Sequence, residues 1–276
     1  MTYAIETKLL SKSFKTYQKP DGLINSLRAI WQRKYTTREA LKPTTIKIEA
    51  GTIVGLVGAN GAGKTTLLKI LSGLVAPTSG DANVLGFKPW ERDSRYLTQM
   101  GILLGQKNQL WWDISPFDSF MLLARIYDLN VAATRKHVMH LADLLNCTHV
   151  LNTQLRRLSL GERMKMEIIG ALLHKPRILF LDEPTIGLDI VAQENIRNFL
   201  IEYVKVEKPT IILTSHYMDD IATLADSLLL ISKGDIVYQG TVEEFTANTN
   251  NTLAQDEEVD FEEVIRRFLE KESRIR

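Results

Sequence analysis

The feature that most constrains this chain is an eight-residue run, Gly58–Thr65 (GANGAGKT), which directly follows an apolar segment, Thr52–Val57 (TIVGLV). The run matches the pattern G-x-x-x-x-G-K-[ST], in which glycines let successive backbone N–H groups turn inward around phosphate oxygens at the start of a helix. We expect Lys64 to bridge the β- and γ-phosphates of a nucleotide and the Thr65 hydroxyl to ligate Mg²⁺. A plain glycine-rich turn is the structural alternative, but Lys-Thr between a strand and a helix favours a nucleoside triphosphate site. The residues predicted to bind the nucleotide here are Gly58, Ala59, Asn60, Gly61, Ala62, Gly63, Lys64, Thr65 and Thr66.

Composition and charge exclude several other classes of protein. Of the 276 residues, 45% are hydrophobic and 24% are charged, as in globular domains and unlike disordered or fibrous chains. The 34 Lys and Arg balance 33 Asp and Glu, so the net charge indicates no attraction to nucleic acid or to an anionic membrane. The single cysteine, Cys147, cannot form an intrachain disulfide and is interpreted as a small apolar residue of a helix. We also find no signal peptide and no apolar run near the ~20 residues that span a bilayer, and therefore expect a soluble, cytoplasmic chain.

Short apolar segments predict the core of the fold. Thr52–Val57, Arg177–Asp182 and Thr210–Ser215 are rich in β-branched residues or leucine and end at small or polar residues. Continuous apolar runs of this kind suit a parallel sheet that is covered on both faces. A fourth strand is expected at Ser227–Ser232, followed by a turn and a short edge strand at Asp235–Tyr238. Because helical patterns lie between the strands, we predict an α/β fold.

The middle of the chain, from about Pro116 to Leu173, contains no convincing strand. Phe117–Tyr127 and Thr134–Leu145 carry apolar residues at helical spacing, and Met164–Leu173 is an apolar helical segment. We therefore predict a helical insert within the α/β fold.

A second chemical signal is the apolar strand that ends in two adjacent carboxylates, Asp182 and Glu183. Asp182 at a strand tip can hold Mg²⁺ through its water shell. Glu183 can orient and deprotonate the water that attacks the γ-phosphate. Such a pair alone is usually a polar turn, but an upstream phosphate loop favours the catalytic interpretation.

The order of these motifs carries a family resemblance. GANGAGKT (58–65), LSLGE (158–162), ILFLDEP (178–184), GLD (187–189) and TSH (214–216) together resemble the nucleotide-binding subunit of an ATP-binding cassette (ABC) transporter, over nearly the whole chain. Three longer sequence segments, GQKNQLWWDISPFDSF, LDEPTIGLD and TSHYMDDI, are similar to segments of the ATPases that pair with ABC-2 type permeases. These ATPases usually act in export.

The resemblance implies a P-loop NTPase fold, with a RecA-like parallel sheet, an antiparallel β lobe and an α-helical insert. The ABC ATP-binding domain is expected over residues 1–245. It includes a basic insert at about 15–42 and a helical subdomain at about 107–173. Residues 246–276 are expected to form a polar linker and a C-terminal helix.

The residues of two peripheral segments predict their structure. In the basic insert, apolar side chains between residues 23 and 31 share one helical face, which predicts a helix that caps the domain. Thr246–Gln255 is rich in Asn and Thr and predicts a linker, and Asp256–Arg276 predicts a helix whose charge runs from acidic to basic.

Three further roles follow from the resemblance. Gln106 corresponds to the glutamine that contacts both the Mg²⁺ shell and the attacking water, and it is expected to be catalytic and metal-binding together with Thr65 and Asp182. Asp189 resembles the D-loop aspartate, which bridges the two subunits of a dimer. His216 resembles the switch histidine that hydrogen-bonds the γ-phosphate.

The signature segment departs from the family pattern Leu-Ser-Gly-Gly-Gln. Ser159 and Gly161 are kept, whereas Leu160 and Glu162 differ. In the family, these residues cap the γ-phosphate that the opposite subunit binds. Ser-x-x-Glu before an apolar helix is also a capping box, so we expect Glu162 to point toward its own cap and away from the phosphate.

The adenine platform has two candidates. The family stacks adenine on an aromatic residue before the second strand. Tyr35 precedes Ala40-Leu41 much as the family's aromatic residue precedes its own Ala-Leu, and it is preferred here. Phe14, after Lys12-Ser13, is the alternative, and either residue can instead be an ordinary core or surface aromatic.

These observations predict an ATP-hydrolysing subunit of an ABC-2 type exporter, with ATP and Mg²⁺ as cofactors. Its expected partners are a second copy in a head-to-tail dimer and a separate permease, with no nucleic acid. It is expected at the cytoplasmic face of the cell membrane. The alternative is a soluble ABC-type ATPase acting on ribosomes or DNA. A small-molecule phosphate-loop kinase is disfavoured because it would lack Ser159, Gly161 and His216 in register.

Overall fold

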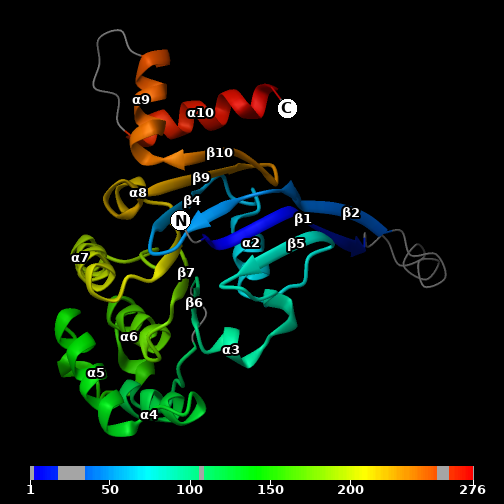
Figure 1. Cartoon of the computed structure of the whole chain (residues 1–276). Helices are drawn as coiled ribbons and strands as arrows, with labels where there is room; N and C mark the ends of the chain where they lie inside the picture. The colour runs from blue at the N-terminus through cyan, green and yellow to red at the C-terminus, as the bar shows by residue number, and fades with distance from the viewer. Residues whose placement is uncertain (1–2, 18–34, 106–108, 254–260, 276) are drawn as a thin grey trace, which may run out of the picture.

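A computed structural model describes residues 3–17, 35–105, 109–253 and 261–275 (Figure 1). Its centre is a six-stranded sheet in the order β10-β9-β4-β8-β7-β6. The strands are β4 (Ile53–Val57), β6 (Met100–Leu104), β7 (Ile178–Asp182), β8 (Thr210–Thr214), β9 (Ser227–Ser232) and β10 (Asp235–Thr241). All neighbours pair in parallel except β9 and β10, which form an antiparallel hairpin. The parallel sheet and its edge hairpin are as the sequence predicts.

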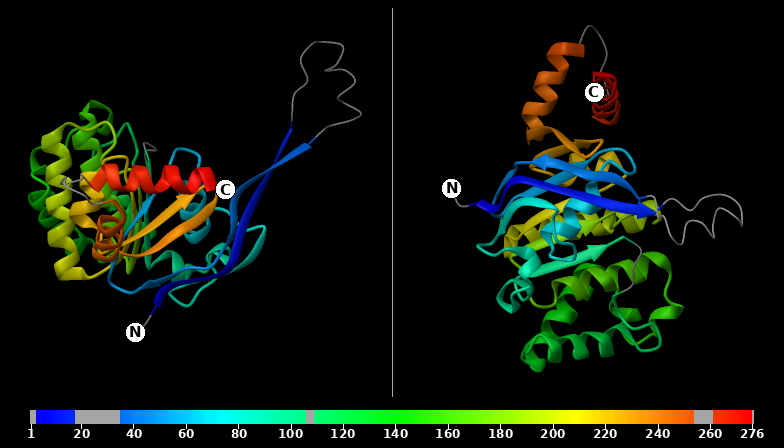
Figure 2. Two further views of the ribbon diagram at one scale, coloured as in Figure 1. Left: turned by 90° about the horizontal axis from the view of Figure 1, so that it is seen from above. Right: turned by 90° about the vertical axis from the view of Figure 1, so that its right-hand side faces the viewer.

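A second, antiparallel sheet forms the β lobe. It contains β1 (Tyr3–Tyr17), β2 (Tyr35–Thr44), β3 (Lys47–Glu49) and β5 (Ser79–Val84), with β1 pairing all three others. The distal parts of β1 and β2 project from the body as a two-stranded ribbon (Figure 2).

Helices cover both faces of the central sheet. The helices of the core are α2 (Lys64–Leu71), α3 (Ser94–Leu97), α7 (Ile190–Glu207) and α8 (Met218–Leu224). The helical subdomain contains α4 (Pro116–Ile126), α5 (Val131–Leu144) and α6 (Leu160–Leu172). It lies at one end of the molecule, next to α7 (Figure 1). Single 3₁₀ turns occur at Pro89–Glu91, Thr148–Val150 and Leu155–Arg157.

Helix starts in the subdomain are specified locally. The side chain of Ser115 accepts a hydrogen bond from the backbone N–H of Asp118 and is followed by Pro116, a favourable first helical residue. Asn130 caps α5 in the same way. The predicted helical insert is therefore present, with boundaries within a few residues of those expected from periodicity.

Two hydrophobic cores lie on opposite faces of the parallel sheet. Successive residues of β7 alternate between them: Leu179 and Leu181 pack with α6, α7 and the helical subdomain, while Ile178 and Phe180 pack with α2 and the β lobe. Because strand side chains alternate between faces, an all-apolar strand serves both cores at once. Cys147 is buried in the first core, and burial raises the pKa of its thiol to about 12, in agreement with its expected role as a small apolar residue. The expected helical position is wrong, because Cys147 lies between the end of α5 and the 3₁₀ turn at Thr148–Val150.

One peripheral prediction is wrong in part. Much of the expected linker at 246–255 is helical, because α9 spans Val242–Leu253; the Thr241 hydroxyl accepts a hydrogen bond from the Glu244 N–H, and the Glu244 carboxylate accepts one from the Thr241 N–H. The two ends of the basic insert at about 15–42 are strands, up to Tyr17 and from Tyr35, and the helix expected between them is not tested. The segment between residues 23 and 31 lies outside the described residues. A C-terminal helix is present as predicted, as α10 (Phe261–Ile275).

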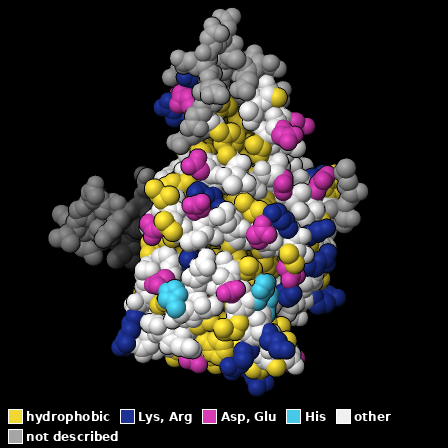
Figure 3. All heavy atoms as spheres, turned by 90° about the vertical axis from the view of Figure 1, so that its left-hand side faces the viewer, with side chains coloured by type: hydrophobic (Ala, Val, Ile, Leu, Met, Phe, Trp, Pro, Cys, Tyr) yellow, Lys and Arg dark blue, Asp and Glu magenta, His cyan; other side chains and the backbone are white. Residues whose placement is uncertain are grey.

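The surface of the helical subdomain is partly apolar. Figure 3 shows hydrophobic side chains at the lower end of this face, with Lys and Arg beside them. Within the part of the chain that the structure describes, every helix is too short or too polar to cross a bilayer.

Candidate nucleotide site

The loop between β4 and α2 has a backbone that only glycine can supply at several positions. Gly61 and Gly63 have φ values of 77° and 118°, in the left-handed region. A Cβ atom on Gly63 would lie 2.6 Å from the Ala40 carbonyl oxygen, and one on Gly58 would lie 2.2 Å from that of Ile231. The loop therefore packs closely against β2 and the end of β9.

Lys64 is held inside this loop. Its Nζ donates hydrogen bonds to the carbonyl oxygens of Gly58 at 2.5 Å and Ala59 at 3.3 Å. Burial lowers the pKa of Lys64, and the negative charges of Glu183 and Asp182 oppose that change. The ammonium group is thus positioned where phosphate oxygens would replace the loop carbonyls.

Asp182 lies at the end of β7, directly across from α2. Its Oδ1 accepts hydrogen bonds from the hydroxyls of Thr214 at 2.8 Å and Thr65 at 3.4 Å. Carboxylate and hydroxyl oxygens are the ligands that Mg²⁺ prefers, and Mg²⁺ takes its remaining ligands from phosphates and water. Among the described residues no group of three His, Cys, Asp or Glu could hold a metal alone. The pair of oxygens from Thr65 and Asp182 fits an ion that arrives with a nucleotide.

Glu183 and His216 meet at the same edge of the sheet. His216 Nε2 lies 2.8 Å from Glu183 Oε1. The backbone N–H of Glu183 bonds to both the carbonyl and the hydroxyl oxygen of Thr214, at 3.1 and 3.0 Å. Glu183 has φ of 57°, an uncommon value outside glycine that costs energy and clusters at functional sites. The two side chains predicted to act at the γ-phosphate therefore contact each other.

A buried polar cluster, which the sequence reasoning missed, supports this edge. Asp220 is fully buried and accepts hydrogen bonds from the hydroxyls of Thr185 and Ser215 and from Arg197. Thr185 follows Glu183 and Ser215 precedes His216, so one carboxylate joins the two loops that carry the site. In the sequence, only the acidic pair of the segment TSHYMDDI could have indicated this buried cluster.

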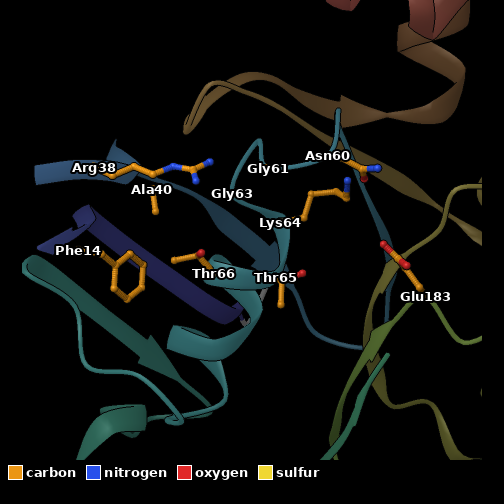
Figure 4. A pocket seen from close by; sticks show the side chains of 10 residues that line it. All are labelled: Phe14, Arg38, Ala40, Asn60, Gly61, Gly63, Lys64, Thr65, Thr66 and Glu183. Atoms are coloured by element: carbon orange, nitrogen blue, oxygen red, sulfur yellow. The ribbon is translucent and has the colours of Figure 1, made fainter. Parts of the chain in front are cut away.

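A cavity of about 390 Å³ opens beside the loop (Figure 4). It extends from Glu183 and Lys64 to Phe14 and Arg38 on the β lobe. Phe14 and Arg38 are directly paired across β1 and β2, and Figure 4 shows both side chains on the lobe side of the cavity. Arg38 Nη2 would be 3.3 Å from a Cβ atom on Gly61, so its guanidinium lies beside the loop. Sequence reasoning did not select Arg38.

The geometry favours the alternative platform residue over the preferred one. Phe14 lines the cavity. The backbone of Tyr35 pairs with Tyr17, three residue pairs farther out along the ribbon than Phe14 and Arg38. At a rise of ~3.3 Å per residue, this is about 10 Å farther from the loop. The side chain of Tyr35 lies outside the described residues.

The signature residues are arranged as a helix cap. Ser159 begins α6, and both hydrogen bonds of a capping box with Glu162 are present. Glu162 Oε2 accepts from the Ser159 N–H at 2.9 Å and from its hydroxyl at 2.7 Å, and Oε1 lies 3.6 Å from His149. The predicted capping box is confirmed. Of the described residues, those lining the cavity do not include Ser159, Gly161 or Glu162.

Asp189 is not among the residues that line the cavity. Asp189 caps α7 by accepting a hydrogen bond from the Ala192 N–H at 2.9 Å, and the next two residues, Ile190 and Val191, are strongly exposed. Gln106 lies outside the described residues. Its neighbour Gly105 is bonded through its N–H to the Asp182 carbonyl at 2.9 Å.

Comparison with known proteins decides the family. The sequence profile described as "ABC transporter" matches residues 41–186, which contain the phosphate loop, the signature segment and the Asp182-Glu183 strand. The chain belongs to the ABC transporter family. It is therefore an ABC transporter ATP-binding subunit, whose nucleotide-binding cassette hydrolyses ATP, and the predicted fold and family are confirmed.

Two curated relatives and one solved structure illustrate the similarity. This ABC ATPase is 32% identical to the ABC transporter ATP-binding protein NatA of Bacillus subtilis, over 77% of this chain and 86% of NatA. It is 30% identical to the doxorubicin resistance ATP-binding protein DrrA of Mycobacterium tuberculosis, over 78% of this chain and 65% of DrrA. Its fold matches a structure described as a dimeric post-hydrolysis state of the ATP-binding cassette MJ0796 bound to ADP and Pi. That match has a TM-score of 0.71 and 21% identity, and covers 86% of this chain and 98% of that one.

Proposed function

We propose that this ABC ATPase powers an ABC-2 type exporter from the cytoplasmic face of the cell membrane, through a separate permease. The observation that carries the proposal is that Lys64 and Glu183 line one cavity. Asp182 is bonded to Thr65 of that lining and His216 contacts Glu183, whereas Ser159 is not among the residues that line the cavity. The sequence segments 105–120, 181–189 and 214–221 and the resistance protein DrrA among the relatives support export.

The residues on the page suggest how hydrolysis proceeds. The loop N–H groups and Lys64 bind the β- and γ-phosphates. Thr65 and Asp182 are the residues that would hold Mg²⁺, which supplies charge neutralisation to those phosphates when bound. Glu183 takes the proton of the water as its oxygen attacks the γ-phosphorus and the bond to ADP breaks. His216, 2.8 Å from Glu183, orients that carboxylate and offers a hydrogen bond to the γ-phosphate.

Phe14 and Arg38 extend the site to the part of the cavity that would hold the adenine base of ATP. We assign Phe14 as the adenine platform, because it lines the cavity at the end away from Glu183. Arg38, its partner across the ribbon, places a cation between the platform and the phosphate loop. A guanidinium there suits the α-phosphate or the ribose hydroxyls.

The remaining part of the site comes from a second copy. The N-terminus of α6 is capped by Ser159 and Glu162, and its N–H groups make an anion site that a single subunit leaves apart from its own cavity. In a head-to-tail dimer, this end of α6 would meet the γ-phosphate bound by the partner subunit. Closure on ATP would then bring the two helical subdomains together, and hydrolysis would release them.

Purification from native membranes separates export from the alternative, a soluble ATPase acting on ribosomes or DNA. The tagged chain is extracted in mild detergent, in parallel with a Lys64→Ala variant as a control for ATP-dependent contacts. We expect one polytopic membrane protein at a fixed stoichiometry, encoded next to this chain. Recovery of the chain with ribosomes or DNA and without a membrane partner would contradict the proposal.

A further inference from the structure

A buried carboxylate on α6 has no part in the site described above. Glu167 is 4% exposed and faces the chain segment that follows β6. Its Oε1 accepts hydrogen bonds from the backbone N–H groups of Gln109 at 3.1 Å and Leu110 at 3.3 Å, and its Oε2 accepts from Gln109 at 3.0 Å. A side chain of α6 thus satisfies two consecutive backbone donors of another segment.

The residue that Glu167 binds is attached to the catalytic sheet. The side-chain amide of Gln109 donates a hydrogen bond to the Ile102 carbonyl of β6 at 2.7 Å. Leu104, near the end of the same strand, pairs with Asp182 on β7. Gln109 therefore joins α6 to the edge of the sheet that carries Asp182 and Glu183.

A second contact acts beside the first. Arg163, one turn before Glu167 on α6, places its guanidinium 5.0 Å from the centre of the Trp112 ring. Trp112 and its neighbour Trp111 are 44% and 43% exposed, whereas Leu110, just before them, is only 4% exposed. Helix α6 therefore contacts segment 109–112 through two side chains one turn apart, Arg163 and Glu167.

Burying the Glu167 carboxylate costs desolvation free energy, which indicates that this side chain does more than fill space. Burial raises the pKa of Glu167, which the hydrogen bonds from Gln109 and Leu110 and the charge of Arg163 oppose. An apolar side chain at this position would fill the same space without desolvating a carboxylate. What the carboxylate adds is orientation, because three hydrogen bonds to two N–H groups fix the angle between α6 and the segment.

We infer that Glu167 is a positioning residue that couples the exposed segment at Trp111-Trp112 to the signature end of α6. Ser159 begins that helix eight residues before Glu167, about 12 Å along a rigid rod at 1.5 Å per residue. A displacement of segment 109–112 is thereby transmitted to the helix terminus that meets the partner's nucleotide. The inference rests on the proposed head-to-tail dimer.

The test compares Glu167→Ala and Glu167→Gln with Met166→Ala in the full chain. Met166 is a fully buried neighbour in α6, so its truncation opens a cavity without touching Gln109. For each protein we would measure the melting temperature, ATP affinity of the monomer, kcat, KM and the Hill coefficient for ATP. Glu167→Gln retains one acceptor oxygen and is the milder variant, available if Glu167→Ala does not fold.

If Glu167 positions α6, its substitution should lower the turnover rate without lowering ATP affinity. Glu167→Ala should keep monomer ATP affinity, lose kcat by roughly ten- to a hundredfold and show a Hill coefficient near one, because a misplaced signature end fails the partner's site. Glu167→Gln should fall between Glu167→Ala and the wild type. Met166→Ala should lower the melting temperature while keeping kcat and the Hill coefficient.

Two outcomes would overturn the inference. One is that kcat follows the melting temperature alike in Glu167→Ala and Met166→Ala, which assigns Glu167 to stability alone. The other is a Glu167→Ala or Glu167→Gln protein with wild-type kcat and Hill coefficient. A wild-type chain that neither dimerises nor hydrolyses ATP cooperatively would instead contradict the proposed function, so the two failures are distinguishable.

Discussion

At the scale of single residues, the site consists of side chains whose neighbours leave them few alternatives. Lys64 is bonded to loop carbonyls, Asp182 to two hydroxyls and Glu183 to His216. The sequence predicts these four because they belong to short motifs of fixed spacing. It does not predict the Phe14–Arg38 pair, because that pairing depends on the register of two strands separated by the residues between 17 and 35.

Phe14 and Tyr35 provide a matched comparison of the two platform candidates. Phe14→Ala should weaken ATP binding by about 1–3 kcal/mol, the usual contribution of stacking one base on an aromatic ring. Tyr35→Ala should bind ATP with nearly wild-type affinity. Titration with ATP in a hydrolysis-deficient background measures both, and a larger loss for Tyr35→Ala would assign the platform to Tyr35.

Glu162→Gln tests whether the unusual signature carboxylate repels the nucleotide. The amide can still serve the third position of a capping box, and Glu162 is committed to Ser159 and His149, so we expect ATP-driven dimerisation to be unchanged. Dimer content measured against ATP concentration decides this, and a clear tightening would mean that the charge faces the γ-phosphate.

The same variant has a defined pH signature. The hydrogen bonds from Ser159 and the charge of His149 lower the pKa of Glu162 below that of the unfolded chain. Its contribution to stability is therefore complete above the unfolded pKa, and it is lost as the pH falls through the folded pKa. Glu162→Gln should cost less than about 1 kcal/mol at neutral pH, because the side chain is 31% exposed and solvent screens part of its interactions, and nothing in strong acid. Urea unfolding at both pH values measures the difference.

At the scale of elements, continuous apolar strands were the most predictable part. Arg177–Asp182 was expected and β7 begins one residue later, because a strand buried on both faces needs apolar residues at every position. The error at α9 has a local cause that was visible in the sequence, since Thr241 and Glu244 have the spacing of a capping box. The Asn and Thr content of 246–251 hid that signal.

The segment after β6 should bind the permease through its tryptophans. Trp111 and Trp112 are both about half exposed, and tryptophan is enriched where truncation costs ~2 kcal/mol or more of binding energy. Trp111→Ala and Trp112→Ala should weaken co-purification with the permease, while the isolated subunit still folds and binds ATP.

Trp90 is the control for these two variants. It packs against the core of the β lobe, so Trp90→Ala should lower the melting temperature without weakening assembly. Melting curves of the isolated subunit and co-purification are compared for all three. Intact co-purification of both Trp111→Ala and Trp112→Ala would contradict a docking role for this segment.

At the scale of the whole molecule, the account requires two copies. One chain supplies the phosphate loop and Glu183 at a cavity, with Asp182 bonded to Thr65 and His216 in contact with Glu183. It presents the signature end of α6 elsewhere. The family's order of motifs predicted this division, but no pattern in a single sequence could show that the signature cap lies outside its own subunit's cavity. The Glu167 contacts would then make the helical subdomain responsive to whatever moves segment 109–112.

The most direct test of the two-copy site is light scattering during size-exclusion chromatography of Glu183→Gln, with and without ATP and Mg²⁺. Loss of the general base should reduce hydrolysis by ~10²–10⁴-fold while leaving binding intact, so ATP should accumulate a stable dimer. Lys64→Ala should remain monomeric, because the phosphate charge is no longer compensated. A Glu183→Gln protein that stays monomeric at saturating ATP, or hydrolyses ATP at the wild-type rate, would contradict the account.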